Sequence, residues 1–285
     1  MPFLQHFGLN DYPFGLTPNP RLFFPSEQAQ ALLDALAFAI TRGDGLLKVV
    51  GEVGSGKTLL CRMLLERLRA QPVNTAYFNA PIAMTGAQLP HLVAREFGLD
   101  PQDVVDPLRE LRRFLLDEHA QGRRNVLIID EAQALGVEGL EAVRLLSNLE
   151  TDTDKLLQIV LFGQAELDQL LRRRDLRQMA QRLSFSFTTK PFSDMSTAAY
   201  VRFRLERCAG IGMARAVFSP AALRHLAKTS GGLPRIVNRL ADKALLAAYA
   251  EDAAIVEPRH IRAALRETPD LRRGWRTLWC RIGLA

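Results

Sequence analysis

Gly51-Glu52-Val53-Gly54-Ser55-Gly56-Lys57-Thr58 is the stretch that decides the fold of this 285-residue chain. It fits the pattern G-x-x-x-x-G-K-[S/T] at every fixed position. Residues 46–50 before it are almost all apolar and predict a short buried strand. After it, one face of a predicted helix carries the apolar residues Leu59, Leu60, Met63, Leu64 and Leu68. A strand, a glycine loop and a helix in this order are typical of a phosphate-binding loop.

The chemistry of such a loop follows from its backbone. Glycines adopt dihedrals that other residues avoid, so the N–H groups can turn inward around a phosphate, and the first helical turn adds unpaired N–H groups. We expect Lys57 to reach the β- and γ-phosphates of ATP and the Thr58 hydroxyl to coordinate Mg²⁺. The predicted nucleotide contacts are Gly51, Glu52, Val53, Gly54, Ser55, Gly56, Lys57, Thr58 and Leu59. The alternative is a glycine-rich turn that merely precedes a helix.

A second motif lies about 70 residues downstream, at Asn125-Val126-Leu127-Ile128-Ile129-Asp130-Glu131. An apolar, β-branched run that ends in two carboxylates predicts a central parallel strand, and ligands bind at the carboxyl end of such strands. We expect Asp130 to hold Mg²⁺ through its water shell and Glu131 to orient and polarise the attacking water. Taken alone, an Asp-Glu pair is more often a solvated surface feature.

The whole pattern predicts two folded domains. Strands are predicted at 46–50, 74–79, 125–130, 156–162 and 183–187, and helices at 26–41, 86–97, 103–121, 137–150 and 165–172, with Ser26 as an N-cap. This α/β alternation predicts a P-loop NTPase with a five-stranded parallel sheet in a three-layer sandwich. Beyond Pro191, helices at 194–209, 219–230, 234–250 and 257–267 predict an all-α lid domain. The expected boundaries are 1–25 for an N-terminal segment, 26–191, 192–268, and 269–285 for a basic tail.

The composition of the chain limits its expected cellular location and partners. No stretch reaches the length of a membrane span, and the N-terminus lacks the pattern of a secretory signal. Three widely spaced cysteines form no metal-ligand pattern, so we expect a reduced, cytoplasmic protein. Four of the excess positive charges lie in the last fifteen residues, at Arg272, Arg273, Arg276 and Arg281. They suit a nucleic acid or an anionic membrane surface, although solvated arginines without a fixed partner are commoner.

Two polar residues end predicted strands near the motifs. Gln164 follows the strand after Asp130 and Glu131, where it can reach the γ-phosphate or the adjacent water in a sensor-1-like role, or simply cap the strand. Asn79 ends the second strand and is expected to hydrogen-bond Glu131, restraining it until a partner binds. Both are candidate catalytic residues.

Two arginines complete the set. Arg182 precedes the last strand, and we expect it, in preference to Arg177, to act in trans on a neighbour's γ-phosphate; the alternative is a solvated basic face. Arg235 follows Gly231-Gly232-Leu233-Pro234 and stands at a helix start. A cation is poorly placed there unless it has an anionic ligand, and a nucleotide phosphate reached by domain closure would supply one.

Together these motifs resemble an AAA+ ATPase, and more narrowly the ExeA/GspA-type secretion ATPases and the MshM type of MSHA-pilus biogenesis. The resemblance rests on Phe7-Gly8-Leu9-Asn10, on residues 12–18, on 51–61, and on 149–152 with 155–164. It implies an ATP-dependent homo-oligomer that works with inner-membrane proteins of a pilus or secretion machine. It also implies that the segment before Ser26 packs over the adenine, with Tyr12, Phe14 and Pro18 available, although covering the sheet edge is an equal alternative.

ExeA-like proteins continue into a membrane span and a periplasmic domain, whereas this chain ends at Ala285, which favours the shorter pilus-associated type. Trp275, Leu278 and Trp279 among the tail arginines suggest either a peripheral contact with the inner membrane or packing on the lid. A DNA-binding AAA+ ATPase of the transposition-accessory type is the alternative function, although no nucleic-acid-binding module is apparent. A nucleotide-gated scaffold that barely hydrolyses ATP is the third possibility.

Overall fold

The computed structural model describes residues 2–81, 84–99, 106–210 and 216–268. They form two compact units, one of residues 25–190 and one that joins residues 1–24 to those from 191 onward. The basic tail predicted at 269–285, with its membrane or lid contact, lies outside the described residues.

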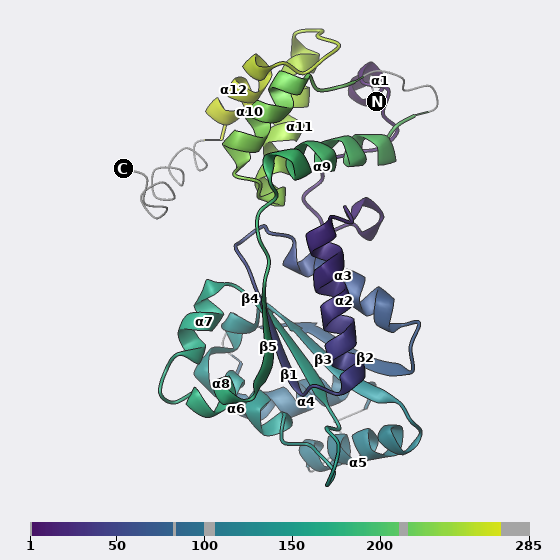
Figure 1. Cartoon of the computed structure of the whole chain (residues 1–285), viewed down its shortest axis with the longest axis vertical. Helices are drawn as coiled ribbons and strands as arrows, with labels where there is room; N and C mark the ends of the chain where they lie inside the picture. Colours follow the sequence, from purple (N-terminus) through teal and green to yellow (C-terminus); the bar gives the residue numbers. More distant parts are fainter. Residues whose placement is uncertain (1, 82–83, 100–105, 211–215, 269–285) are drawn as a thin grey trace. The chain divides into compact units, whose positions relative to one another are not determined.

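The first unit is built on a five-stranded parallel sheet of order β2-β3-β4-β1-β5 (Figure 1). The strands are β1 (Leu46–Val50), β2 (Val73–Asn79), β3 (Arg124–Asp130), β4 (Gln158–Gly163) and β5 (Leu183–Thr188). The three central strands are buried along nearly their whole length, as expected for a parallel sheet covered on both faces. All five strands were predicted.

Helices cover both faces of this sheet. On one face, α3 (Lys57–Leu68) packs on the strands and α2 (Glu27–Arg42) packs on α3. Alternate strand residues point to the opposite face, where Leu127, Ile129, Ile159 and Leu161 share a core with the second layer of helices. That layer contains α4 (Leu89–Glu96), α5 (Pro107–Ala120), α6 (Gly136–Leu146), α7 (Ala165–Leu171) and α8 (Arg177–Gln181). The predicted three-layer sandwich is confirmed.

The helix boundaries reveal what the sequence patterns missed. Ser26 caps α2 as predicted, by accepting a hydrogen bond from Ala29 N–H at 3.2 Å. The helix expected to end at residue 150 ends at Leu146, and the one expected near 86 opens as a short 3₁₀ turn, η2 (Gly86–Gln88). Two short helices, α8 and α1 (Pro2–His6), and the 3₁₀ turns η1 (Pro20–Leu22) and η4 (Ala132–Leu135) were not predicted, because they are too short to show a period.

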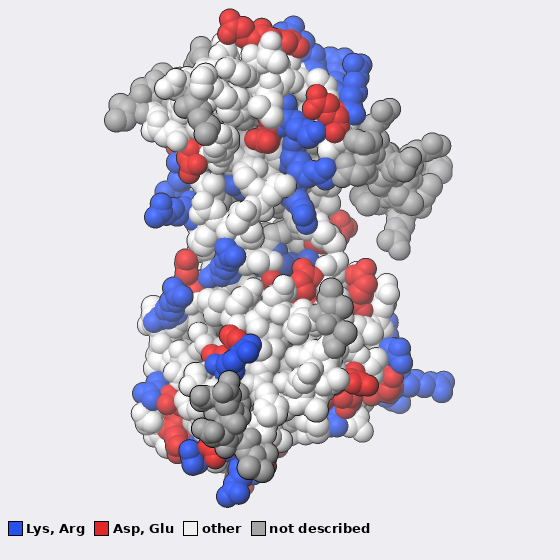
Figure 2. All heavy atoms as spheres, turned by 180° about the vertical axis from the view of Figure 1, so that it is seen from behind, with Lys and Arg blue, Asp and Glu red and all other residues white. Residues whose placement is uncertain are grey.

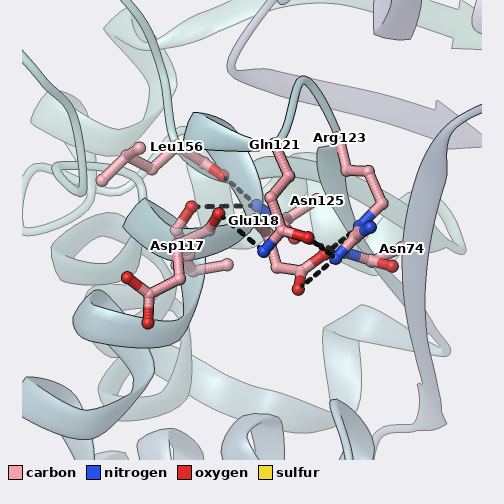
Figure 3. Close-up of polar contacts among 8 residues, drawn as sticks. Asn74, Asp117, Glu118, Gln121, Arg123, Asn125 and Leu156 are labelled. Atoms are coloured by element: carbon pink, nitrogen blue, oxygen red, sulfur yellow. Dashed lines mark hydrogen bonds and ion pairs between the residues drawn. The ribbon is translucent and has the colours of Figure 1, made fainter.

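The amino ends of β2 and β3 are closed by a polar network that reaches the C-terminal turn of α5 (Figure 3). Glu118 accepts hydrogen bonds from Asn74 and, in a two-pronged contact, from Arg123, whose Nη2 lies 2.7 Å from Glu118 Oε1. The buried Asn125 side chain donates to Leu156 O at 3.2 Å and accepts from Asn74 at 3.2 Å. Because every partner here belongs to the unit itself, we assign this network to stability.

The second unit is helical. Its main helices are α9 (Asp194–Arg207), α10 (Pro220–Ser230), α11 (Pro234–Ala250) and α12 (Pro258–Arg266), matching the four predicted ones. Ser193 and Ser219 cap the first two, and Gly231 ends α10 in the left-handed conformation at φ 59°. Among the described residues, no helix combines the length and the apolar character needed to cross a bilayer.

Residues 2–24 are part of this helical unit. Phe7 and Phe14 are 1 % and 2 % exposed within its core, and the Phe14 ring packs edge-on against Phe218. Asn10 N–H donates to Cys208 O, and Arg204 donates to Pro13 O. Phe14 cannot stack on an adenine as suggested, because its ring is already enclosed, whereas Tyr12 is 46 % exposed.

Candidate active site

The phosphate-binding loop lies where β1 ends and α3 begins. Gly54 and Gly56 adopt φ of 81° and 94°, a region that favours glycine, and α3 starts directly at Lys57. Glu52 and Val53 are exposed, and Ser55, Thr58 and Leu59 are partly so. Most of the predicted contact residues are thus at least partly exposed, next to the unpaired N–H groups of the first turn of α3, whereas Gly51 and Lys57 are buried.

Gly51 is required for a different reason, the close approach of the segment after β5. A Cβ at this position would lie 1.7 Å from Thr189 Oγ1 and 2.9 Å from Ser55 Oγ. Thr189 donates a hydrogen bond to Ser55 Oγ at 2.9 Å, and its N–H donates to Val50 O at 2.8 Å. The loop is therefore braced from the side by the chain leaving the last strand.

Lys57 points into the curve of the loop. Its Nζ donates to Gly51 O and to Glu52 O, each at 2.9 Å. Burial lowers the pKa of Lys57, and this effect is opposed by the nearby carboxylates of Glu131 and Asp130. The Lys57 ammonium thus lies within the loop, and its contact with a phosphate stays a prediction.

Asp130 joins the tip of β3 to the start of α3. Its Oδ2 accepts a hydrogen bond from Thr58 Oγ1 at 2.7 Å, and its Oδ1 accepts from Glu131 N–H at 2.9 Å. Burial is the main cause of the raised pKa of Asp130, and the Thr58 hydrogen bond opposes it. The hydroxyl and carboxylate oxygens predicted to hold Mg²⁺ therefore come together from residues far apart in sequence.

These two oxygen donors fit a magnesium ion that shares its coordination with phosphate and water. Mg²⁺ is usually bound by one or two protein oxygens together with substrate phosphates. Among the described residues, no cluster of three or more His, Cys, Asp or Glu side chains could form a protein-only metal site. Thr58 and Asp130 would therefore hold the ion only together with a nucleotide.

Glu131 takes an unusual backbone conformation directly after β3. Its φ of 51° lies in the left-handed region, which is uncommon for a residue other than glycine. Its Oε2 accepts two hydrogen bonds, from Gln133 Nε2 at 2.5 Å and from Gln164 Nε2 at 2.7 Å. Gln164 thus lies beside Glu131 and hydrogen-bonds its carboxylate, and its contact with a γ-phosphate or water stays a prediction.

Gln133 is the residue at this site that the sequence analysis missed. It lies in η4, two residues after Glu131, and its Oε1 also accepts from Gln164 N–H at 3.1 Å. The only sequence signal was a polar side chain close to the second motif. That signal is weak, because it does not say which way the chain turns after the strand.

Asn79 does not make the contact predicted for it. It ends β2, opposite Asp130 in the strand register. Among the described residues, the carboxylate of Glu131 accepts from Gln133 and Gln164, and no hydrogen bond joins it to Asn79. The left-handed turn at Glu131 carries its side chain toward the end of β4 instead.

Arg177 begins α8, and Arg182 directly follows this helix, next to the amino end of β5. Arg182 is exposed and directly precedes β5, whose first residue, Leu183, pairs with Leu46 at the start of β1. The phosphate-binding loop follows the far end of β1, about 15 Å away at about 3.3 Å per residue. Within one copy, Arg182 therefore cannot reach the loop through its own sheet, and its predicted role remains one that acts on another copy.

Arg235 belongs to the helical unit. It is the second residue of α11 and is exposed, and Gly232 before it is needed because a Cβ there would lie 2.0 Å from Phe192 O. This geometry agrees with the local prediction of a cation at a helix start. Its contact with a nucleotide stays a prediction.

Comparison with known proteins supports the fold and the resemblance. A family described as "AAA domain" matches residues 40–171. General secretion pathway protein A of Aeromonas hydrophila is 40 % identical over 274 residues, which are 95 % of this chain and 49 % of that protein. The chain thus spans about half the length of this relative, and the match supports a likeness to the ExeA/GspA-type proteins.

Solved structures agree on the architecture. The ORC2 protein of Aeropyrum pernix has a TM-score of 0.64 at 19 % identity, covering 89 % of this chain and 72 % of its own. The RuvB branch-migration motor of Thermotoga maritima has a TM-score of 0.58 at 17 % identity, covering 90 % and 73 %. At these identities the likeness concerns the fold alone. The chain has the fold of AAA+ P-loop NTPases, with a helical C-terminal part.

Proposed function

We propose that this chain binds ATP with Mg²⁺ and hydrolyses it to ADP and phosphate. The observation that carries the proposal is the contact of 2.7 Å between Thr58 Oγ1 and Asp130 Oδ2. It joins the phosphate-binding loop to the acidic strand tip, so that Lys57, Thr58, Asp130 and Glu131 surround one position. That combination is the one phosphoryl transfer requires.

The proposed roles follow from the chemistry of each group. The N–H groups of the loop and Lys57 would bind the phosphates, and Thr58 and Asp130 would hold Mg²⁺, which when bound supplies positive charge next to them. Glu131 orients a water molecule whose oxygen bonds to the γ-phosphorus as the bond to the bridging oxygen breaks. The water gives up a proton to Glu131, and this proton leaves with phosphate and ADP as products. Gln164, at the end of β4, donates a hydrogen bond to Glu131 and helps to hold its carboxylate in place.

Hydrolysis is proposed to depend on assembly. Arg182 lies too far from the loop of its own copy, so we assign it to the γ-phosphate of a neighbouring copy in a homo-oligomer. Arg235 would contact the nucleotide when the helical unit closes. Both roles remain predictions that rest on position and charge.

The proposed setting is the cytoplasmic face of an inner membrane. The likeness to a general secretion pathway protein supports a role with inner-membrane proteins of a type II secretion system. The finer choice, an MshM-like role in MSHA-type pilus assembly, rests on the sequence resemblance described above.

Steady-state ATP turnover tests the proposal. The purified protein should hydrolyse ATP in the presence of Mg²⁺, with turnover per chain rising with protein concentration, and EDTA should abolish it. Glu131→Gln should bind ATP and not turn it over, whereas Lys57→Ala should not bind it. Equal rates for the native chain and Glu131→Gln would refute the assignment.

The same assay with duplex DNA at physiological salt tests the rival function. Strong stimulation would favour a DNA-dependent ATPase, and its steep decline with added salt would mark phosphate contacts. On the face drawn in Figure 2, the basic side chains of the sheet-containing unit are scattered among acidic ones and form no continuous stripe. We therefore expect DNA to leave the rate unchanged.

A further inference from the structure

We propose that Gln133 is a positioning residue that fixes the carboxylate of Glu131 for attack by water. This inference deepens the proposed function and rests on it, because it assigns Glu131 to ATP hydrolysis. Its basis is a set of three hydrogen bonds among Glu131, Gln133 and Gln164, all within the sheet-containing unit.

The orientation of the Gln133 amide is set by the backbone. Gln164 N–H must find an acceptor, and Gln133 Oε1 supplies it at 3.1 Å. The amide nitrogen of Gln133 then faces Glu131 Oε2, at 2.5 Å. A flipped amide would place two donors face to face at Gln164 and two acceptors face to face at Glu131. The side chain therefore ties Glu131 to the end of β4.

Both amide donors meet on the same carboxylate oxygen. Oε2 accepts from Gln133 and from Gln164, whereas Oε1 has no hydrogen-bond partner among the described residues. With Oε2 held from two directions, the carboxylate cannot rotate about its last bond. Oε1 is left in a fixed place as the acceptor for a proton of the water.

Gly163 makes room for this arrangement. A Cβ there would lie 3.1 Å from Gln133 Oε1 and 2.7 Å from Leu167 Cδ2. The Gly163-Gln164 pair at the end of β4 thus has a joint physical meaning. The glycine admits the amide of Gln133, and the glutamine supplies the N–H that orients it.

Two substitutions separate positioning from simple support. Gln133→Met keeps the length of the side chain and removes both hydrogen bonds. Gln133→Glu keeps an acceptor for Gln164 N–H but replaces the donor to Glu131 with a repelling oxygen. Gln121→Met, an exposed position at the end of α5, is the matched control. For each, steady-state hydrolysis, which gives kcat and KM, and the Kd of a fluorescent ATP analogue are measured.

We expect Gln133→Met and Gln133→Glu each to lower kcat at least about tenfold, with Kd and KM within about twofold of the native chain, since a misplaced catalytic group costs rate and not binding. Gln121→Met should match the native chain. Native-like turnover of Gln133→Glu would overturn the proposal. It would show that accepting the hydrogen bond from Gln164 N–H is enough for activity, without a donor to Glu131. Loss of ATP binding in both variants would overturn it as well.

A second measurement does not depend on hydrolysis and tests the contact even if the protein proves inactive. In urea unfolding without nucleotide, Gln133→Met should lower the folding equilibrium constant about tenfold or more in the native background, the usual scale for a hydrogen bond to a charged group. In a Glu131→Ala background, Gln133→Met should lower the folding equilibrium constant less than about twofold. Equal effects in the two backgrounds would show that Gln133 does not hold Glu131.

Discussion

At the scale of single residues, the site depends on some positions that must lack a side chain and on one that keeps its side chain in a strained backbone conformation. Gly51 admits Thr189, and Gly163 admits Gln133. Glu131 is the opposite case, since it keeps a side chain in a backbone region that usually costs about 1–3 kcal/mol. The hydrogen bond from the Glu131 N–H to Asp130 Oδ1 and the hydrogen bonds to the Glu131 carboxylate hold the residue in this conformation.

Gly51→Ala should destabilise the sheet-containing unit by about 1–3 kcal/mol and weaken ATP binding, because the new Cβ collides with Thr189 and pushes it off the loop. Urea unfolding and nucleotide titration measure the two effects. Gly45→Ala is the control, because its Cβ would meet only the Lys155 side chain at 3.5 Å or more. Adding Thr189→Ala should restore part of the loss, and equal behaviour of the two glycine variants would contradict this account.

At the scale of elements, the carboxyl ends and the amino ends of the strands have different roles. The carboxyl ends of β1, β3 and β4 bear the candidate active site, where polar groups are left for a ligand. The amino ends of β2 and β3 bear the Glu118 network, where polar groups satisfy one another (Figure 3). The two-pronged hydrogen bond from Arg123 is the main reason that the pKa of Glu118 falls to about 2.

That lowered pKa gives a pH-dependent prediction. The folded state prefers Glu118 ionised, so its contribution to stability is fully present above the ordinary value of 4.5 and is lost as the pH falls toward 2. Glu118→Gln should cost about 1.5 kcal/mol at pH 7, the scale of a charge-assisted hydrogen bond, and clearly less at pH 3.5. Urea unfolding at both values measures this.

Glu110→Gln is the control on the same helix. Glu110 pairs with Arg113 on the surface at 3.0 Å, and such pairs contribute little. Its effect should stay below about 0.5 kcal/mol at both pH values. A cost of Glu118→Gln that does not change with pH would mean that its charge is not what stabilises the fold.

At the scale of the whole molecule, the chain folds as two units, and the helical unit is built from two separate parts of the sequence. Residues 1–24 complete the core of this helical unit, whereas the sheet-containing unit begins at residue 25 (Figure 1). A segment predicted to lie near the nucleotide is thus an integral part of the helical core.

Phe14→Ala should destabilise the helical unit by about 3–5 kcal/mol, because the ring is 2 % exposed and its removal leaves a cavity. Hydrogen exchange followed by mass spectrometry should show faster exchange in α10 and α11, with β1 and β3 unchanged. Tyr12→Ala, at an exposed ring, should do much less. Uniform loss of protection in both units would show that they unfold together.

Mixing two inactive variants tests hydrolysis in trans. Arg182→Ala keeps an intact loop and lacks the arginine, whereas Glu131→Gln lacks the catalytic carboxylate and keeps the arginine. An equimolar mixture can form interfaces in which both groups are intact, so its turnover should exceed that of either variant alone. Glu131→Gln mixed with Lys57→Ala should show no such gain. A mixture no faster than its parts would remove Arg182 from the mechanism.

The sequence by itself determined the strands, the main helices and the residues of both acidic and glycine-rich motifs. These are local features: burial makes central strands apolar, and the backbone geometry of the loop demands glycine next to Lys57 and Thr58. Asp130 lies beside Thr58 because the strand that ends at Asp130 and the strand before the loop have their carboxyl ends on the same side of the parallel sheet.

Only the tertiary structure decided which polar side chain holds Glu131. Asn79, Gln133 and Gln164 all lie close to the motif, and the sequence does not show that the backbone turns left-handed at Glu131. That single turn directs the carboxylate away from Asn79 and toward the end of β4. Likewise, the partner of residues 1–24 depended on where a distant apolar core formed. Contacts of this kind are set by long-range packing, which leaves no period in the sequence.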